Sequence, residues 1–349
     1  MPPEIRDVAL EWERLAAACS AVPWMLPGWI AAWWRAFGGG RLEVVEARDE
    51  GELIGILPLS RRRGVSASTA NWHTPEFGPV ARPASVPRLI EEVLADRPRR
   101  LSLAFLEWNR PEAALVVEAC RVAGYRTIVR TLERSPYIAI DGPWESYEGE
   151  RNGKFLRELR RRWRRLQQEG PVTFSVERGQ EGLPAFLAEG FAVEAAGWKG
   201  DRKTAIASST NTRQFYEGIA DWAAERGWLR LGFLRVGQRA IAFDFAMQHD
   251  GSHYLLKTGF DPAFRRFAPG ALLRHAMLRS VFAEGLKNYE FLGADERWKF
   301  DWTRTTRERV LVQAFAPTAS GTADWSAFRF GRPLAKRVLP KRVLQTLRR

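Results

Sequence analysis

The order of the expected elements is what most constrains the fold of this 349-residue chain. A helix, a hairpin, a strand, a second helix and a further strand are expected twice along the sequence. In the second half these elements are expected at 212–227, 229–250, 252–260, 270–285 and 287–294, and in the first half at 26–38, 41–62, 99–108, 111–124 and 125–132. This order predicts a degenerate tandem duplication of one α/β unit.

Composition sets the broad class of the protein. The chain is long and apolar enough, at 45% hydrophobic residues, to bury a sizeable core in two domains. Its two cysteines and four histidines have no metal-ligand or disulfide spacing, so we expect no metal and a reducing, cytoplasmic location. The first residues lack the pattern of a signal peptide, and no apolar run approaches the roughly 20 residues that span a bilayer.

The net charge of +13 is concentrated in two segments. Residues 151–168 hold eight Lys or Arg against one acid, and residues 329–349 hold eight more with no acid, which leaves the remainder nearly neutral. A nucleic-acid-binding surface over the whole protein is therefore not expected. The first segment has an apolar stripe at helical spacing, and it is either a solvated linker helix or a basic wall facing an anionic ligand or membrane. The second is either a solvated tail or an anchor to anionic lipid.

Several stretches carry a resemblance to a known family. They are "SPYIAI" at 135–140, Trp144 and Tyr147, "GWKG" at 197–200, and the segments 215–245, 259–273 and 291–302. The second half resembles the Gcn5-related N-acetyltransferase (GNAT) fold. The whole chain is similar to bacterial acetyltransferases of the CelD type, from cellulose biosynthesis, which are related to Fem-type aminoacyl transferases with two GNAT-like halves.

The resemblance implies an α/β fold with two GNAT-like domains, each a mixed central sheet flanked by helices. The expected organisation is a degenerate N-terminal domain at 1–148, a basic linker helix at 149–170, a C-terminal acyltransferase domain at 171–320 and a basic tail at 321–349. We expect the first domain to bind no coenzyme and to supply one wall of the acceptor cleft.

The stretch "GFDPAFRRFAPGALLRHAML", residues 259–278, places a cationic turn directly before a helix. A helix N-terminus with a nearby glycine is suited to hold an anion. An ordinary loop is the alternative. In the GNAT fold this loop binds the pyrophosphate of acyl-coenzyme A, although the stretch departs from the common Q/R-x-x-G-x-G/A pattern. The coenzyme-binding residues implied are Arg265, Arg266, Phe267, Ala268, Pro269, Gly270, Ala271 and Leu272.

Direct acyl transfer from a thioester needs a base and stabilisation of the oxyanion, but no protein nucleophile. If Asp250 and Gly251 form the hairpin turn, Asp244 faces Lys257 across the strands and Gln248 faces His253. We expect this polar face to form the acceptor site, with Asp244, Lys257 and Glu296 as the catalytic candidates. A solvated strand face with a surface ion pair is the alternative.

The resemblance adds further acceptor-binding candidates near the ends of two segments. Together with His253 they are Trp198, Lys199, Asp295, Lys299 and Trp302. Family members usually have a tyrosine where this chain has Trp298, so a hydroxyl is missing there. Core packing is the alternative role for each tryptophan.

The resulting hypothesis is an acyl-CoA-dependent N-acyltransferase, with acetyl-CoA or another acyl-CoA as co-substrate. Its acceptor is a small-molecule or lipid-linked amine, such as an amino sugar in polysaccharide or cell-envelope assembly. The tail 329–349 would place the enzyme at the inner face of the membrane. One alternative is a Fem-like transferase that uses aminoacyl-tRNA, and another is a non-catalytic GNAT-like binding module.

Overall fold

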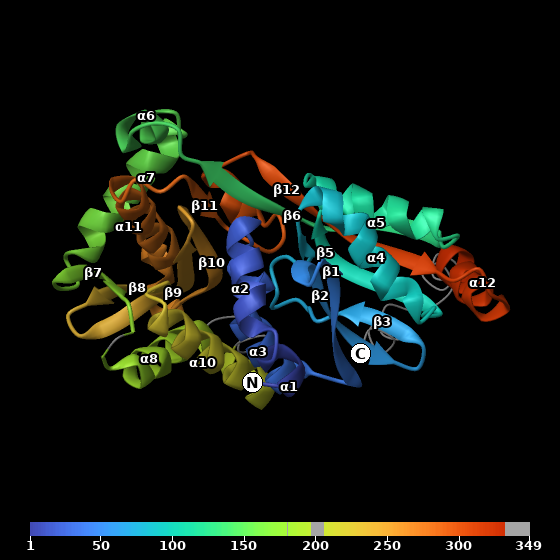
Figure 1. Cartoon of the computed structure of the whole chain (residues 1–349). Helices are drawn as coiled ribbons and strands as arrows, with labels where there is room; N and C mark the ends of the chain where they lie inside the picture. Colours follow the sequence, from blue (N-terminus) through green and yellow to red (C-terminus); the bar gives the residue numbers. More distant parts are fainter. Residues whose placement is uncertain (180, 197–205, 332–349) are drawn as a thin grey trace.

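One continuous mixed sheet runs through both halves of the chain (Figure 1). The structure is a computed structural model that describes residues 1–179, 181–196 and 206–331. In these ranges the strand order is β1-β2-β3-β5-β12-β6-β11-β10-β9-β8-β7, with β4 paired to β2. The strands are β1 (Arg41–Asp49), β2 (Glu52–Arg62), β3 (Val65–Ser68), β4 (Val80–Ala81), β5 (Arg100–Glu107), β6 (Arg126–Ala139), β7 (Val172–Glu177), β8 (Leu229–Val236), β9 (Arg239–His249), β10 (Ser252–Phe260), β11 (Asn288–Glu290) and β12 (Thr306–Phe315).

Helices cover both faces of this sheet. They are α1 (Pro3–Arg6), α2 (Ala9–Ala18), α3 (Pro27–Phe37), α4 (Val86–Ala95), α5 (Pro111–Val122), α6 (Trp144–Gly149), α7 (Gly153–Leu166), α8 (Leu183–Ala195), α10 (Thr210–Glu225), α11 (Pro269–Ala283) and α12 (Ala319–Ser326). The predicted order of elements is therefore present, with α1, α2, β3, β4 and α4 added in the first half. Within the described residues, no helix is both long and apolar enough to cross a bilayer.

Two tight turns were readable from the sequence. The β1–β2 turn has positive φ at Glu50 (47°) and Gly51 (89°), and the β9–β10 turn has positive φ at Asp250 (44°) and Gly251 (71°). Two consecutive residues with positive φ are what a type I′ hairpin turn requires, and Asp-Gly or Glu-Gly places glycine at the second. The predicted hairpins at 41–62 and 229–250 are confirmed, as is the predicted turn at Asp250-Gly251.

The last strand of the chain lies in the sheet of the first half. β12 is antiparallel to β5 on one side and to β6 on the other. β6 then extends beyond β12, and its end from Tyr137 to Ala139 pairs with β11 of the second half. The strand at 306–315, expected within a domain at 171–320, thus completes the sheet of the other half.

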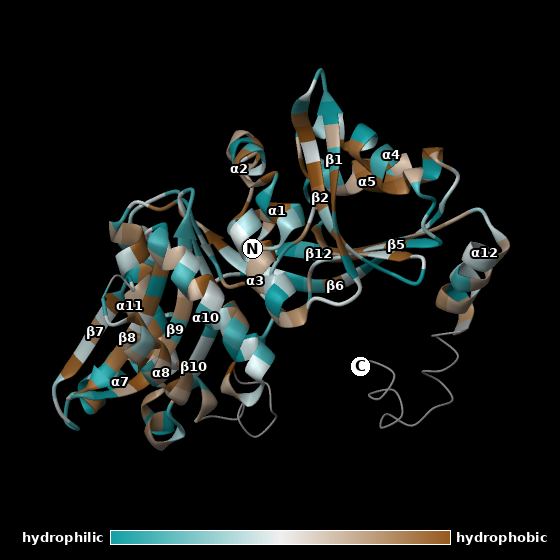
Figure 2. Cartoon of the chain, turned by 60° about the horizontal axis from the view of Figure 1, so that its bottom comes forward, coloured by the Kyte–Doolittle hydropathy of each residue, from teal (hydrophilic) through white to brown (hydrophobic). Residues whose placement is uncertain are grey.

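The N-terminal helices pack on the second half. Side chains of α2 and α3 share one hydrophobic core with α8, α10 and one face of β8–β10 (Figures 1 and 2). Trp29 of α3 lies edge-on to Phe215 of α10, with ring centroids 5.2 Å apart. Phe243, Phe245 and Met247, expected to form a core face of β9, are fully buried in this cluster.

Each half has a further helical layer. In the first half α4 and α5 cover β5 and β12. In the second half α7 and α11 cover the other sheet face, and Leu156, Leu159 and Leu166 form the buried stripe of α7. Asn152 caps α7 by accepting hydrogen bonds from two backbone N–H groups. The predicted amphipathic character of this arginine-rich helix is confirmed.

Candidate active site

Strands β10 and β11 separate soon after they meet. Ser252, His253 and Tyr254 pair in parallel with β11, which ends at Glu290, while β10 continues to Phe260. The chain then turns through a short 3₁₀ segment into α11. A strand edge left without its neighbour exposes backbone donors and acceptors to a ligand.

A first cavity of about 410 Å³ lies at this opening. It is bounded by the end of β10, the loop that begins α11, and side chains from α7, α8 and the segment after β11. The lining residues are Phe155, Glu194, Thr258, Gly259, Phe260, Arg265, Ala268, Gly270, Ala271, Arg274, Glu296, Trp298, Asp301 and Trp302. Half of the predicted coenzyme loop therefore faces this cavity: Arg265, Ala268, Gly270 and Ala271.

The other four loop residues do not line the cavity. Phe267, Pro269 and Leu272 are buried beneath the loop. Arg266 forms an ion pair with Glu169 at 2.9 Å and lies over the ring of Phe267. These contacts fix the loop against the body of the domain.

The backbone of the loop is set for a close approach. Ala268, immediately before α11, has φ 50° and ψ 57°, in the left-handed region that glycine adopts most readily. Arg265, Ala268 and Gly270 have the spacing of the R-x-x-G-x-G pattern, and alanine replaces its first glycine. A Cβ added at Gly270 would point into the cavity, where it meets only Phe260 Cδ1 at 3.6 Å.

A second cavity of about 220 Å³ lies between the two halves. The first half contributes Trp72, His73, Thr74, Pro75, Phe105 and Glu133. The second half contributes Tyr216, Leu255, Leu256, Lys257, Thr258, Phe291, Leu292, Gly293, Ala294, Glu296, Trp298 and Lys299. Thr258, Glu296 and Trp298 line both cavities, so the two spaces meet at these side chains.

Glu296 occupies this common wall. Its side chain is 49% exposed, and its Oε2 accepts a hydrogen bond from Trp298 Nε1 at 3.0 Å. The ammonium of Lys299 lies 3.5 Å from the same oxygen. Trp298 thus orients the carboxylate.

The predicted pairing of Asp244 with Lys257 is wrong. Leu256 forms a bulge in β10, which shifts the register so that Asp244 lies opposite Thr258. Asp244 is fully buried and forms a bidentate ion pair with Arg274 of α11, with both N–O distances 2.8 Å. The polar face expected to receive the acceptor is covered by α11 at this point.

His253 also lies away from the two cavities. It is opposite Gln248, as expected, but it is fully buried and stacks on Tyr289 with ring centroids 4.8 Å apart. Burial, together with the charges of Arg274 and Arg230, lowers the pKa of His253 to about 3. A neutral, enclosed imidazole suits packing better than acceptor binding.

The remaining predicted acceptor residues differ in position. Lys299 lines the second cavity, but its Nζ donates to the carbonyl oxygens of Leu292 and Ala294 at 2.6 and 2.7 Å. Burial lowers the pKa of Lys299. Trp302 is buried against the first cavity, while Asp295 is exposed and lines neither cavity. Trp198 and Lys199 lie outside the described residues, as does the tail from residue 332.

Two residues of the second cavity were missed by the sequence analysis. The hydroxyl of Tyr216 lies 3.4 Å from Nδ1 of His73, and the ammonium of Lys257 lies 5.5 Å from the centre of the Tyr216 ring. Burial, with the charge of Lys257, lowers the pKa of His73 to about 3. No local pattern links these three residues, because they come from both halves of the chain.

The described residues hold no cluster of three His, Cys, Asp or Glu side chains suited to a metal ion. What the arrangement offers is an anion-binding helix start beside one cavity and polar groups around a second. Two adjacent spaces with a common wall can hold two substrates close to each other.

Comparisons with known proteins bear on the fold of the chain. The family described as acetyltransferase (GNAT) domain matches residues 153–300. A comparison with curated proteins finds no match. The narrower resemblance to CelD-type acetyltransferases stays a prediction.

Solved structures give similarity over nearly the whole chain. FemX is 13% identical over 95% of this chain and 98% of its own, with a TM-score of 0.58. The C-terminal domain of a protein described as a lysylphosphatidylglycerol synthetase from Agrobacterium fabrum is 14% identical over 93% and 96%, with a TM-score of 0.55. L-PGS from Bacillus licheniformis is 15% identical over 82% and 90%, with a TM-score of 0.51. Residues 153–300 therefore match an acetyltransferase (GNAT) domain, and they lie in a mixed α/β fold whose sheet continues through both halves of the chain.

Proposed function

We propose that the protein is an acyl-CoA-dependent N-acyltransferase that transfers an acyl group, most simply acetyl, directly to an amine. The observation that carries this proposal is the first cavity, which opens where β10 leaves β11 and is bounded by the start of α11. That position gives a thioester a polar strand edge and a phosphate a helix N-terminus.

The residues present fit the coenzyme. Pro269 has no N–H, and the N–H groups of Ala271 and Leu272 donate to the carbonyl oxygen of Ala268. The N–H of Gly270 is thus the first-turn donor left for a phosphate, which the positive end of the helix dipole also favours. Arg265 lines the cavity and supplies a cation, while the missing side chain of Gly270 keeps the space open. A backbone N–H of β10, beyond its pairing with β11, would stabilise the oxyanion of the thioester.

The amine acceptor would enter the second cavity. Its wall from the first half includes Glu133 and His73, and its wall from the second half includes Lys257. This mixture of charges and hydrogen-bonding groups suits a polar acceptor such as an amino sugar, free or lipid-linked. The first half thereby supplies part of the acceptor site.

Glu296 is the base in this proposal, because it borders both cavities. The amine nitrogen attacks the thioester carbonyl carbon, so that a C–N bond forms and the C–S bond breaks. The proton leaves the nitrogen for Glu296, directly or through water, and the coenzyme thiolate takes up a proton on departure. Lys257, near the acceptor, orients it, whereas Asp244 positions Arg274 instead of receiving the proton.

Calorimetric titration with acetyl-CoA tests the coenzyme site. The wild-type protein should bind, and Gly270→Val should abolish binding because its side chain enters the cavity. Gly142→Val is the matched control: a Cβ there meets nothing within 4 Å, its φ is not in the left-handed region, and it lies outside both cavities. Unchanged affinity in a folded Gly270→Val protein would refute the assignment.

Transfer from aminoacyl-tRNA is a second candidate, favoured by the exposed arginines of α7. Arg160 and Arg161 are 63% and 60% exposed, while Phe155 of the same helix lines the first cavity. A polyanion could therefore follow α7 to the reaction centre. Activity that needs tRNA, falls steeply with salt and disappears with RNase would favour this reading. Binding of neither acetyl-CoA nor tRNA would leave a non-catalytic module.

A further inference from the structure

A tryptophan of the first half is exposed to solvent at the second cavity. Trp72 lines this cavity and is 70% exposed, although residues 74–77, which follow closely in the chain, are buried. Among the large apolar residues that are exposed in the described parts of the chain, it is the one that lines either of the two cavities. A lone exposed apolar side chain needs no explanation elsewhere on a surface, but at a proposed site it is a candidate for ligand binding.

The ring of Trp72 contacts a residue with a strained backbone. Phe105 lies edge-to-face with it, with ring centroids 5.1 Å apart and 83° between the ring planes. Between Leu103 and Leu106 two residues of β5 stand opposite one residue of β12, and Phe105, in this bulge, has φ 66°. Bulges redirect side chains, and a left-handed backbone at a residue other than glycine is often found at functional sites. The redirected Phe105 lines the second cavity together with Trp72.

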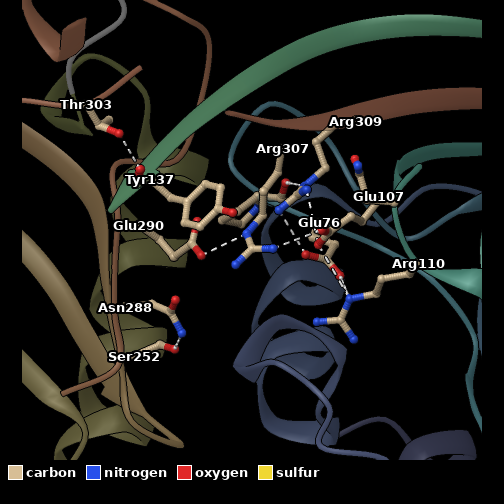
Figure 3. A network of polar contacts seen from close by, with 12 residues as sticks. Glu76, Glu107, Arg110, Tyr137, Ser252, Asn288, Glu290, Thr303, Arg307 and Arg309 are labelled. Atoms are coloured by element: carbon tan, nitrogen blue, oxygen red, sulfur yellow. Dashed lines mark hydrogen bonds and ion pairs between the residues drawn. The ribbon is translucent and has the colours of Figure 1, made fainter. Parts of the chain in front are cut away.

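Buried ion pairs hold the chain on the C-terminal side of Trp72 (Figure 3). Glu76 Oε2 lies 3.0 Å from Nη2 of Arg309, whose Nε donates to the carbonyl oxygen of Pro75 at 3.3 Å. Nη1 of Arg309 also lies 3.2 Å from Oε2 of Glu107. The three charged residues are at most 5% exposed, so water competes little for these contacts. The network therefore ties the segment that carries Trp72 to β5 and β12.

The turn that contains Trp72 is fixed by its own hydrogen bonds. Asn71 Oδ1 accepts from the backbone N–H of His73 at 2.9 Å, and the carbonyl oxygen of Asn71 accepts from that of Thr74 at 2.8 Å. The ring of His73 stacks on Phe37, with ring centroids 5.4 Å apart. Because the segment is already ordered, a ligand that binds to Trp72 loses little affinity to the ordering of the chain.

These surroundings indicate the chemistry of a ligand. At 70% exposure, at least one face of the Trp72 indole is open beside its contact with Phe105. An open indole face binds the apolar face of another ring. The other walls of the cavity include the carboxylate of Glu133 and the ammonium of Lys257, which suit hydroxyl groups as donors and acceptors. A sugar ring has both an apolar C–H face and hydroxyl groups at its rim, whereas an aromatic ring offers the face alone.

We propose that Trp72 recognises the acceptor in the second cavity, and that this acceptor is an amino sugar whose apolar ring face stacks on the indole. The inference rests on the proposed function in one respect, since it takes the second cavity as the acceptor site. Trp72 lines the second cavity but not the first, whereas Glu296 borders both. The sugar ring would therefore lie on the acceptor side, with its amine toward the common wall.

Ligand-observed saturation transfer NMR on the full chain tests the ligand class, with three primary amines as probes. D-glucosamine has the sugar ring, D-glucamine is an open-chain counterpart, and benzylamine has an aromatic ring without hydroxyl groups. D-glucosamine should bind more tightly than both of the others. Equal or tighter binding of D-glucamine, tighter binding of benzylamine, or no transfer to D-glucosamine would overturn the proposal. Because this binding needs neither coenzyme nor turnover, a failure of the acyl-CoA proposal would not alter the result.

A matched set of variants locates the binding. Trp72→Ala should weaken D-glucosamine binding roughly three- to tenfold, the effect of one lost ring contact, and Trp72→Phe should restore most of it. Trp108→Ala is the control, because Trp108 is also exposed, at 40%, but lines neither cavity. Equal effects of the two alanine variants, or no effect of Trp72→Ala, would refute the role of Trp72. Acetyl-CoA titration should give the same affinity for Trp72→Ala as for the wild type, and a weaker affinity would indicate a general structural loss and contradict this role.

Discussion

The buried pair of Asp244 and Arg274 gives the sharpest prediction, because the sequence and the structure assign Asp244 different roles. If Asp244 were the catalytic base, Asp244→Asn would lower turnover and leave the free energy of unfolding unchanged. In the structure both side chains are at most 1% exposed and share two contacts of 2.8 Å. Asp244→Asn therefore leaves a guanidinium buried without its counter-ion.

The expected cost follows from desolvation. Removing one partner of a buried ion pair costs about 3–5 kcal/mol of the free energy of unfolding, since the remaining charge stays out of water. Arg274→Met should cost a similar amount. The double variant should lose less than the sum of the two single losses, because it leaves neither charge alone. Urea unfolding of the four proteins measures these differences.

Glu296→Gln supplies the comparison for catalysis. Its carboxylate is half exposed, so the variant should keep the stability of the wild type while losing acyl transfer. Acyl transfer per folded molecule should fall further in Glu296→Gln than in Asp244→Asn. A fully stable Asp244→Asn protein that has lost turnover would contradict the structural role and restore Asp244 as the base.

Three further predictions follow from the structure. Ala268→Gly should not lower the free energy of unfolding in urea, because the left-handed backbone costs alanine about 1 kcal/mol. The control Ala271→Gly should lower it by about 0.5–1 kcal/mol. A larger loss of stability at position 268 than at position 271 would contradict the prediction. The pKa of His253 falls from 6.5 to about 3 on folding, so the unfolded state binds the extra proton and the stability from this group is lost as pH falls below 6.5. His253→Leu should reduce the slope of the free energy of unfolding against pH, measured by urea unfolding below pH 6.5, by up to about 1.4 kcal/mol per pH unit. An unchanged slope would refute this role of His253. We also propose that the basic tail binds anionic lipid. Deletion of 332–349, which retains Phe328 and its contact with Arg100, should abolish salt-sensitive sedimentation with anionic vesicles. Equal sedimentation of the full-length and truncated proteins would refute the anchor.

Local patterns predicted the elements of the fold. Asp250-Gly251 adopts the turn that its residue types favour, and it sets the register correctly from His249 to Leu255. The apolar stripe of α7 identified its buried face. The alternation of Phe243, Phe245 and Met247 identified one face of β9, although the other face is buried as well. These features depend on residues a few positions apart, so the sequence contains their determinants directly.

The candidate site was predicted only in part. Gly270 and Arg265 were predicted from turn and helix-start signals, which are local, and both line the first cavity. The pairing of Asp244 was wrong because one extra residue, Leu256, bulges from β10, and no rule of alternation reveals such a bulge. The partner that replaced Lys257 is Arg274, 30 residues further along the chain.

The relation between the halves was decided by tertiary packing alone. β12 pairs between β5 and β6, and α3 packs on α10, although in each case the partners are more than 150 residues apart. The same packing brings His73 to Tyr216 and so builds the second cavity from both halves. An exposed strand edge can pair with any strand of suitable length, and an apolar helix face can pack on any surface of matching shape. The sequence therefore specified which surfaces must be buried, whereas the partner that buries each one was settled by which arrangement packs all of them at once.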